Sequence, residues 1–290
     1  MRPTWHFVDP ADLRWLLALT ASRVHQASAY QYRILELDEP TRRRGREVLE
    51  KALRGGKALT REELGVVLTA AGLEASGVRL GYFLMDAELE AVICSGPRRG
   101  KRHTYALLEE RLPPASPRTR DEALAELARR YVEGHGPAQV GDLSWWSGLT
   151  MADARRALEA AEPPLRRESA GERTFWVSPT EPPAPTKPSG PLVHLLPNYD
   201  ELLIAFRDRT DAADPDLPPA ARVAQVILAH VIVRDGLVVG GWRRGSEGPA
   251  AQVVPSFLVE LDAAERRAFE AAVARMAAFL GRPVEVVAPD

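Results

Sequence analysis

The amino-acid sequence predicts an α+β protein in which two similar helix-plus-hairpin units precede a small C-terminal β-rich domain with a closing helix. Three observations lead to this prediction. A pattern of three helices followed by a β-hairpin occurs twice before residue 180. The proline-rich segment Pro179–Pro191 then disfavours both helix and sheet hydrogen bonding and ends the second unit. Beyond it, strand-like apolar runs lead into one amphipathic helix.

The composition is that of a globular protein rather than a disordered one. The 290 residues are 45% hydrophobic and 27% charged, which suffices for one large core or two to three small ones. No apolar run reaches eighteen residues, and charged residues interrupt the first thirty, so we expect no membrane span, no signal peptide and a cytoplasmic protein. The single cysteine, Cys94, fits a reducing compartment and is expected to be a small buried residue.

The first copy of the pattern begins with a helix over Thr41–Gly55, which a pair of glycines ends. A Thr-x-x-Glu capping box opens the second helix, Thr60–Gly72, and the third runs from Gly77 to about Val92. Short strands are expected at Ala91–Cys94 and His103–Leu108. Helix, helix, helix and hairpin is the order of a winged-helix unit.

The second copy repeats this order with little sequence identity. Helices are predicted over Arg120–Gly134 and Val140–Trp146, and a third follows the capping residue Thr150. A hairpin is predicted from Leu165–Glu168 and Thr174–Val177. Tandem winged-helix units therefore account for this region without a long structureless loop. At least one of the adjacent tryptophans on the short second helix is expected to fill the core.

The C-terminal domain is predicted from β-rich runs followed by a helix and a final strand. Two apolar segments, Pro191–Leu196 and Leu202–Phe206, come first, and the β-rich runs are Ala224–Val233, Gly236–Trp242 and Ala251–Val259. The helix is expected over Asp262–Leu280 and the final strand over Pro283–Val287. The whole chain is then divided as follows: 1–40, a remnant strand and connecting helices; 41–112 and 113–179, winged-helix units; 180–191, a linker; 192–290, the β-rich domain.

The charge distribution bears on the partner. A net charge of −2 argues weakly against nucleic acid, but residues 1–180 hold 27 Lys and Arg against 25 Asp and Glu, and residues 181–290 hold 11 against 15. The segment Thr41–Lys57 is locally the most basic. A DNA-binding protein needs a basic face rather than a basic total, so duplex DNA remains a candidate partner.

The hairpin turn of the unit at 41–112 is the strongest candidate for a basic DNA-binding face. The turn carries four cationic side chains, Arg98, Arg99, Lys101 and Arg102, around a glycine. A wing lays its tip along phosphates while the third helix fits the major groove, so these residues predict salt-sensitive binding of double-stranded DNA. The alternative is a solvated loop that only maintains solubility. Replacing all four by alanine separates these interpretations.

Two further groups are weaker candidates for DNA contact. Arg155 and Arg156 lie on the third helix of the second unit, where a charged face is also common on any surface helix. Trp242, Arg243 and Arg244 end a predicted strand, where arginines are usually just solvated.

Three separated runs carry a resemblance to a known family. RPTWHFVDPADLRWLLALTASRV, VICSGPRRGKRHTYALLEER and HLLPNYDELLIAFRDR closely resemble bacterial winged-helix proteins of the AlkZ-like class. The resemblance implies three tandem winged-helix units, a C-terminal β-rich domain, and a DNA glycosylase that removes alkylated purines and unhooks crosslinks. It also implies a Gln-x-Gln or Gln-x-Asp motif that positions the hydrolytic water. In the family this motif lies in the first of the three winged-helix units.

The sequence departs from this family at the catalytic motif. None of the five glutamines has a second Gln, an Asp or a Glu two positions later, so no catalytic residue can be assigned. Residues 1–8 would be the last strand of a first unit, and Asp9–Arg23 a connecting helix. We expect that the natural product starts upstream, and whether this chain is an enzyme stays open.

No other chemistry competes with DNA binding. The sequence has no Walker A loop, GxGxxG, HExxH or GxSxG, and its six histidines lack metal-ligand spacing, so neither a metal nor a cofactor is predicted. Three functions remain: a DNA-binding protein acting in repair, a glycosylase if a further N-terminal segment supplies the motif, and a protein-interaction scaffold. Only the scaffold predicts no salt-dependent DNA affinity.

Overall fold

The computed structural model describes residues 6–180, 190–213, 230–245, 248 and 250–288. The chain divides into two compact units, Met1–Ser178 and Pro179–Asp290, with the boundary at the start of the proline-rich segment. The α+β class is confirmed, as are the C-terminal sheet and its closing helix. Residues 181–189 of the predicted linker lie outside the described residues.

The first helix-plus-hairpin unit, here called the first repeat, spans residues 39–111. Its sheet is antiparallel in the order β1-β3-β2. Its elements are α2 (Glu39–Leu53), β1 (Leu59–Thr60), α3 (Arg61–Ala70), α4 (Gly77–Leu89), β2 (Ile93–Ser95), β3 (Thr104–Leu107) and α5 (Leu108–Arg111). The predicted order of three helices and a hairpin is therefore present.

Local sequence explains where these helices begin and end. Asp38 accepts from the backbone N–H of Thr41 and starts α2 two residues earlier than predicted. The capping box at Thr60 is complete and starts α3. Helix α4 ends at Leu89 rather than near Val92, because Ala91 adopts a left-handed conformation with φ 55°.

The second repeat spans residues 120–177 and has the same order of elements. They are α6 (Arg120–His135), α7 (Val140–Ser147), α8 (Met151–Glu159), β4 (Arg166–Ala170) and β5 (Arg173–Val177). An isolated antiparallel β-bridge between Ala138 and Trp176 places one further residue beside β5. Trp146 packs against the core of this repeat, which confirms that one of the adjacent tryptophans is internal, whereas Trp145 is 40% exposed.

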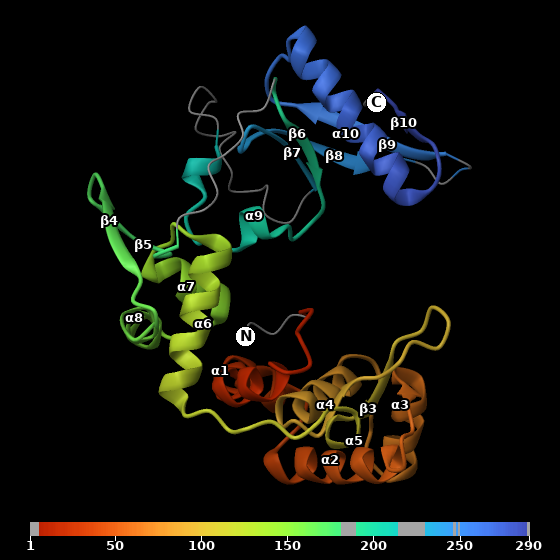
Figure 1. Cartoon of the computed structure of the whole chain (residues 1–290). Coiled ribbons are helices and arrows are strands. Elements are labelled where there is room, and N and C mark those ends of the chain that lie inside the picture. The colour runs from red at the N-terminus through yellow and green to blue at the C-terminus, as the bar shows by residue number, and fades with distance from the viewer. Residues whose placement is uncertain (1–5, 181–189, 214–229, 246–247, 249, 289–290) are drawn as a thin grey trace. The chain divides into compact units, whose positions relative to one another are not determined.

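Helix α1 (Leu13–Ile34) is common to both repeats. Trp15 and Leu19, in its N-terminal half, belong to the core of the second repeat, and Tyr32, near its end, belongs to the core of the first. Figure 1 shows α1 between the two helical groups. Of the strand predicted over residues 1–8, residues 6–8 lie in no strand, and residues 1–5 fall outside the described residues.

The second unit is a five-stranded sheet in the order β10-β9-β8-β7-β6, antiparallel except for the β9–β10 pair. Its elements are β6 (Val193–Leu196), α9 (Glu201–Ile204), a 3₁₀ turn (Thr210–Ala212), β7 (His230–Arg234), β8 (Leu237–Arg244), β9 (Ala251–Phe257), α10 (Ala263–Leu280) and β10 (Val284–Val286). The larger apolar cluster on the sheet includes Phe269 and Val273 of α10, so this helix covers one face (Figure 1). The first part of the predicted run Ala224–Val233 lies outside the described residues.

Candidate nucleic-acid interface

The turn between β2 and β3 is a narrow, exposed hairpin tip. Backbone hydrogen bonds of 3.0 and 3.1 Å link Arg99 and Arg102 in both directions. Gly100 between them has φ 60°, a conformation that glycine adopts without steric cost. The side chains of this tip are therefore carried on an ordered backbone.

Arg99 differs from the other three cations of the tip. Its guanidinium forms an ion pair with Glu63 at 2.7 Å and donates to the carbonyl of Ala58 at 2.6 Å. The pKa of the Glu63 carboxyl is lowered, first by the hydrogen bond from Arg99 and then by its capping contact with Thr60. Arg99 thus ties the tip to the start of α3, and its predicted contact with a phosphate stays a prediction, since its side chain is 53% exposed.

Arg98, Lys101 and Arg102 are exposed, and their side chains make no hydrogen bond or ion pair among the residues that the structure describes. Arg102 lies near enough to Glu62 to contribute to the lowered pKa of that carboxyl, after the hydrogen bonds that Glu62 accepts. Groups held by no hydrogen bond or ion pair are available to an anion. We name these three residues the wing cations.

The two arginines predicted on α8 have different surroundings. Arg156 forms an ion pair with Asp121 at 2.5 Å, so its charge is compensated within the protein. The side chain of Arg155 has no such contact in the described part of the chain and lines a pocket. Of these two arginines, only Arg155 has no acidic partner among the described residues.

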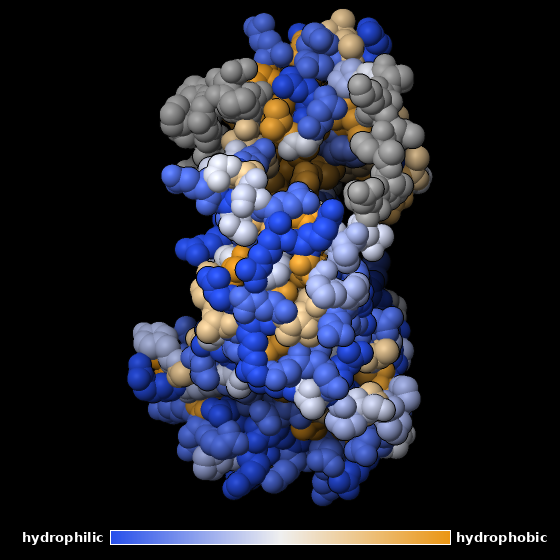
Figure 2. Space-filling model, turned by 60° about the vertical axis from the view of Figure 1, so that its left-hand side comes forward, coloured by the Kyte–Doolittle hydropathy of each residue, from blue (hydrophilic) through white to orange (hydrophobic). Residues whose placement is uncertain are grey.

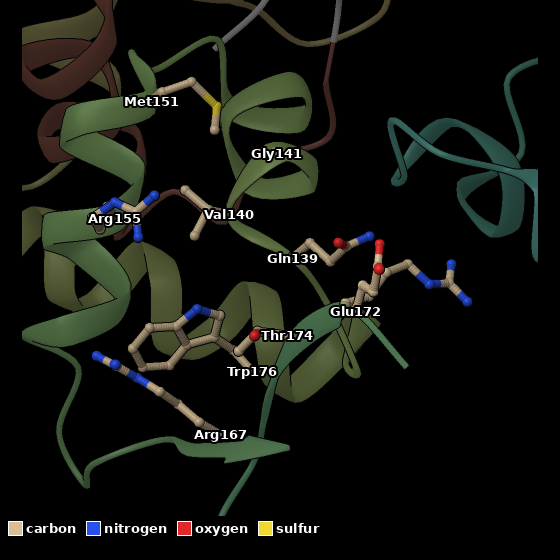
Figure 3. A pocket seen from close by; sticks show the side chains of 10 residues that line it. Gln139, Val140, Gly141, Met151, Arg155, Arg167, Glu172, Thr174 and Trp176 are labelled. Carbon is tan, nitrogen blue, oxygen red and sulfur yellow. The ribbon is translucent and has the colours of Figure 1, made fainter. Parts of the chain in front are cut away.

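The pocket beside Arg155 lies between α7, α8 and the β4–β5 hairpin and has a volume of about 470 Å³. Figure 3 shows the indole of Trp176 between the side chains of Arg155 and Arg167. The guanidinium of Arg167 lies 4.3 Å from the centre of the indole, a cation–π contact. Gln139 and Met151 also line this pocket.

Sequence reasoning missed Arg167 and Trp176 as parts of this pocket. Trp176 is 5% exposed, and its backbone exchanges hydrogen bonds of 2.7 and 3.0 Å with Ala138. The alternation of residues in β5 is the signal that could have placed the indole on the inner face of the hairpin. Nothing local indicates that the neighbouring strand would place an arginine over that ring.

The prediction for Trp242 requires a correction. Its side chain is only 8% exposed and packs into the sheet core, where the indole N–H donates to the carbonyl of Leu196 at 3.0 Å. A buried indole cannot contact a duplex directly. Arg243 and Arg244, at the end of β8, are exposed.

The basic segment Thr41–Lys57 is less available than its sequence indicates. Arg42 and Arg46 form ion pairs with Asp86 at 2.8 and 2.7 Å, and the Asp86 side chain is 1% exposed. Both arginines also pair with Glu39, at 2.5 and 2.6 Å. These charges hold α2 against α4, and we do not place the DNA surface there.

The described residues contain no group of three or more His, Cys, Asp or Glu side chains arranged to hold a metal. Within the same residues, no helix combines the length and apolar character needed to cross a membrane. The face drawn in Figure 2 is mostly hydrophilic, with apolar residues in separate spots.

Comparison with known proteins gives a consistent result. A search of curated protein sequences found no match. The solved structure of Streptomyces sahachiroi DNA glycosylase AlkZ superposes with a TM-score of 0.75 at 23% sequence identity, covering 99% of this chain and 80% of that one. This likeness concerns the fold. The family model described as DNA glycosylase AlkZ-like matches residues 1–279, and the chain therefore belongs to the AlkZ-like DNA glycosylase family.

Proposed function

We propose that each repeat is a winged-helix unit and that this protein binds double-stranded DNA as part of DNA repair. The order of three helices and a hairpin in both repeats supports the first part of the proposal. Membership of a DNA glycosylase family supports DNA as the partner. We place this DNA binding in the cytoplasm, because the free, buried thiol of Cys94 is consistent with a reducing compartment.

The observation that carries the proposal is the arrangement of the wing cations. Arg98, Lys101 and Arg102 project from a tip that Arg99 holds against α3 through Glu63 and Ala58. Repulsion between neighbouring cations is tolerable in water and is relieved when phosphates approach. The tip is thus better suited to a DNA-bound state than to a free one. Arg155, beside its pocket, is the second contact that we propose, and Arg243 and Arg244 are a third and weaker one.

The first prediction concerns the triple variant Arg98→Ala, Lys101→Ala, Arg102→Ala. We expect weaker binding to any duplex, and a plot of log affinity against log salt that is flatter by about 0.9 for each phosphate that the variant no longer neutralises. Thermal stability should hardly change, because these side chains are exposed and bury almost nothing. Equilibrium DNA binding at several salt concentrations, together with thermal melting, measures both effects.

A matched control variant removes three positive charges outside the hairpin tip. Lys51, Arg267 and Arg282 are exposed cations outside the tip, and their replacement by alanine should leave the salt slope nearly unchanged. Equal slopes and affinities for the wild type and the wing variant would show that the wing is a solvated loop. Failure of the wild type to bind duplex DNA at low salt would favour the protein-interaction scaffold instead.

Glycosylase activity is a second candidate, favoured by the family match. Against it, no Gln-x-Gln or Gln-x-Asp motif is present in the chain, so we assign no residue the role of positioning the hydrolytic water. We therefore predict that the purified 290-residue chain binds a duplex containing a methylated purine without releasing the base. Release is measured by converting abasic sites to strand breaks with alkali. More breaks than in the same duplex given alkali without the protein would show that the chain releases the base and would contradict this prediction.

A further inference from the structure

The first residues of α7 border the pocket that contains Trp176: Gln139, Val140 and Gly141. The N–H groups of a first helical turn have no acceptor within the helix. The carboxylate of Asp142 accepts from the N–H of Gln139 at 2.8 Å. The N–H groups of Val140 and Gly141 have no acceptor among the residues that the structure describes. The start of α7 therefore leaves two N–H donors beside this pocket.

The indole of Trp176 is an independent donor in the same pocket. The residue is 5% exposed, and a buried indole N–H usually has a hydrogen-bond acceptor. The described part of the chain supplies none for this one, although the backbone of Trp176 is bonded to Ala138. Figure 3 shows the nitrogen-bearing edge of the ring turned toward Val140 and Arg155. A buried donor that faces a pocket without a partner is expected where a ligand supplies the acceptor.

The charged side chains around these donors favour an anion. Three arginines and one glutamate line the pocket: Arg155, Arg167, Arg173 and Glu172. Arg155 is exposed and forms no ion pair within the described residues. Arg167 reaches Glu159 only at 3.4 Å, and this exposed pair neutralises its charge weakly. Positive charge therefore exceeds negative charge around the unpartnered N–H groups.

Neutral N–H donors together with guanidinium groups select a negatively charged ligand with several acceptor oxygens. A phosphate meets both requirements, and helix N-termini and arginines are groups with which proteins bind the phosphates of DNA. The pocket also lies between the third helix and the hairpin of its repeat, the two elements that a winged-helix unit places on a duplex. We propose that this pocket binds a phosphate of the DNA backbone, an inference that rests on the proposed DNA-binding function. The phosphate oxygens accept from the N–H of Val140, the indole of Trp176 and the guanidinium of Arg155.

The experiment replaces Val140 by proline, which removes the N–H and suits the first position of a helix. Gln139 before it is already extended, with φ −97° and ψ 163°, as a residue before proline prefers. Val140→Ala is the matched control, because it shortens the same side chain and keeps the N–H. We expect Val140→Pro to bind a fully paired duplex roughly tenfold more weakly than Val140→Ala, since a hydrogen bond to a charged acceptor is lost. The salt slope should not change, because the lost donor is neutral.

Two further variants test the other donors. Trp176→Phe keeps an aromatic ring without the indole N–H and should also weaken binding at an unchanged salt slope. Arg155→Gln should flatten the plot of log affinity against log salt by about 0.9, whereas Arg267→Gln on α10 should not. In the Arg155→Gln background, Val140→Pro should weaken binding less than in the wild type, because the two donors share one phosphate.

Thermal melting and inorganic phosphate complete the test. Equal duplex affinities of Val140→Pro and Val140→Ala would overturn the proposal and leave the proposed function intact. If inorganic phosphate alone then stabilises the wild type, the pocket takes the free ion rather than DNA. If Val140→Pro melts well below Val140→Ala, Arg155→Gln and Trp176→Phe decide, and wild-type binding by both would overturn the proposal. A wild-type chain that does not bind the duplex at low salt would overturn both the phosphate site and the proposed function.

Discussion

Replacing Asp86 by alanine should destabilise the first unit by about 3–5 kcal/mol, because it removes the buried carboxylate that pairs with two largely buried cations. Arg42 and Arg46 approach this carboxylate from α2, and their side chains are only 16% and 15% exposed. The guanidinium of Arg42 also lies 4.2 Å from the centre of the Tyr32 ring, so turning to solvent would break a cation–π interaction as well. Chemical denaturation of the wild type and the variant measures the decrease in stability.

Two further variants make the Asp86 prediction specific. Glu39→Ala removes a carboxylate that contacts the same two arginines but is 57% exposed, so its cost should stay within about 1 kcal/mol. Replacing Asp86, Arg42 and Arg46 together by leucine, methionine and methionine should recover most of the stability that Asp86→Ala removes. An Asp86→Ala cost no larger than that of Glu39→Ala would mean that the buried pairs do not hold α2 to α4.

Phe83→Ala is the second variant with a large expected effect. Phe83 lies in the core of the first repeat and is 1% exposed, so truncation should cost about 3–5 kcal/mol of unfolding free energy. Its ring lies directly over Gly45 of α2, where an added Cβ would be 2.6 and 2.8 Å from Cδ1 and Cε1 of Phe83. The absence of a side chain at Gly45 therefore permits the close approach of α2 and α4.

A double-mutant cycle tests this contact. In the wild-type background, Gly45→Ala should destabilise the protein by about 1–3 kcal/mol, because a fully buried ring cannot move aside. In the Phe83→Ala background the same change should stabilise it by up to about 1 kcal/mol, since alanine is the better helix former and the space is then open. The same sign in both backgrounds would contradict this packing of Phe83 over Gly45.

Local sequence patterns alone were enough to locate most elements, since the signals that start and stop them act over a few residues. The capping boxes at Thr60 and Thr119 each satisfy N–H groups of the turn they begin. The early end of α4 was not located in this way, because Ala91 is a left-handed residue other than glycine, which no composition rule marks. The hairpin tip carrying the wing cations was found in the same local way.

Tertiary structure alone decided which of the predicted cations and aromatic residues are available to a partner. Arg99 is held by Glu63 and Arg156 by Asp121, whereas Arg98 beside Arg99 has no such contact among the described residues. Trp242 is buried because β6 runs close enough to accept its indole hydrogen bond. In each case the partner is distant in sequence, and charge or aromatic content does not encode which distant group folding places beside it. The propensity of a segment is a local property, whereas the accessibility of a side chain depends on every element packed around it.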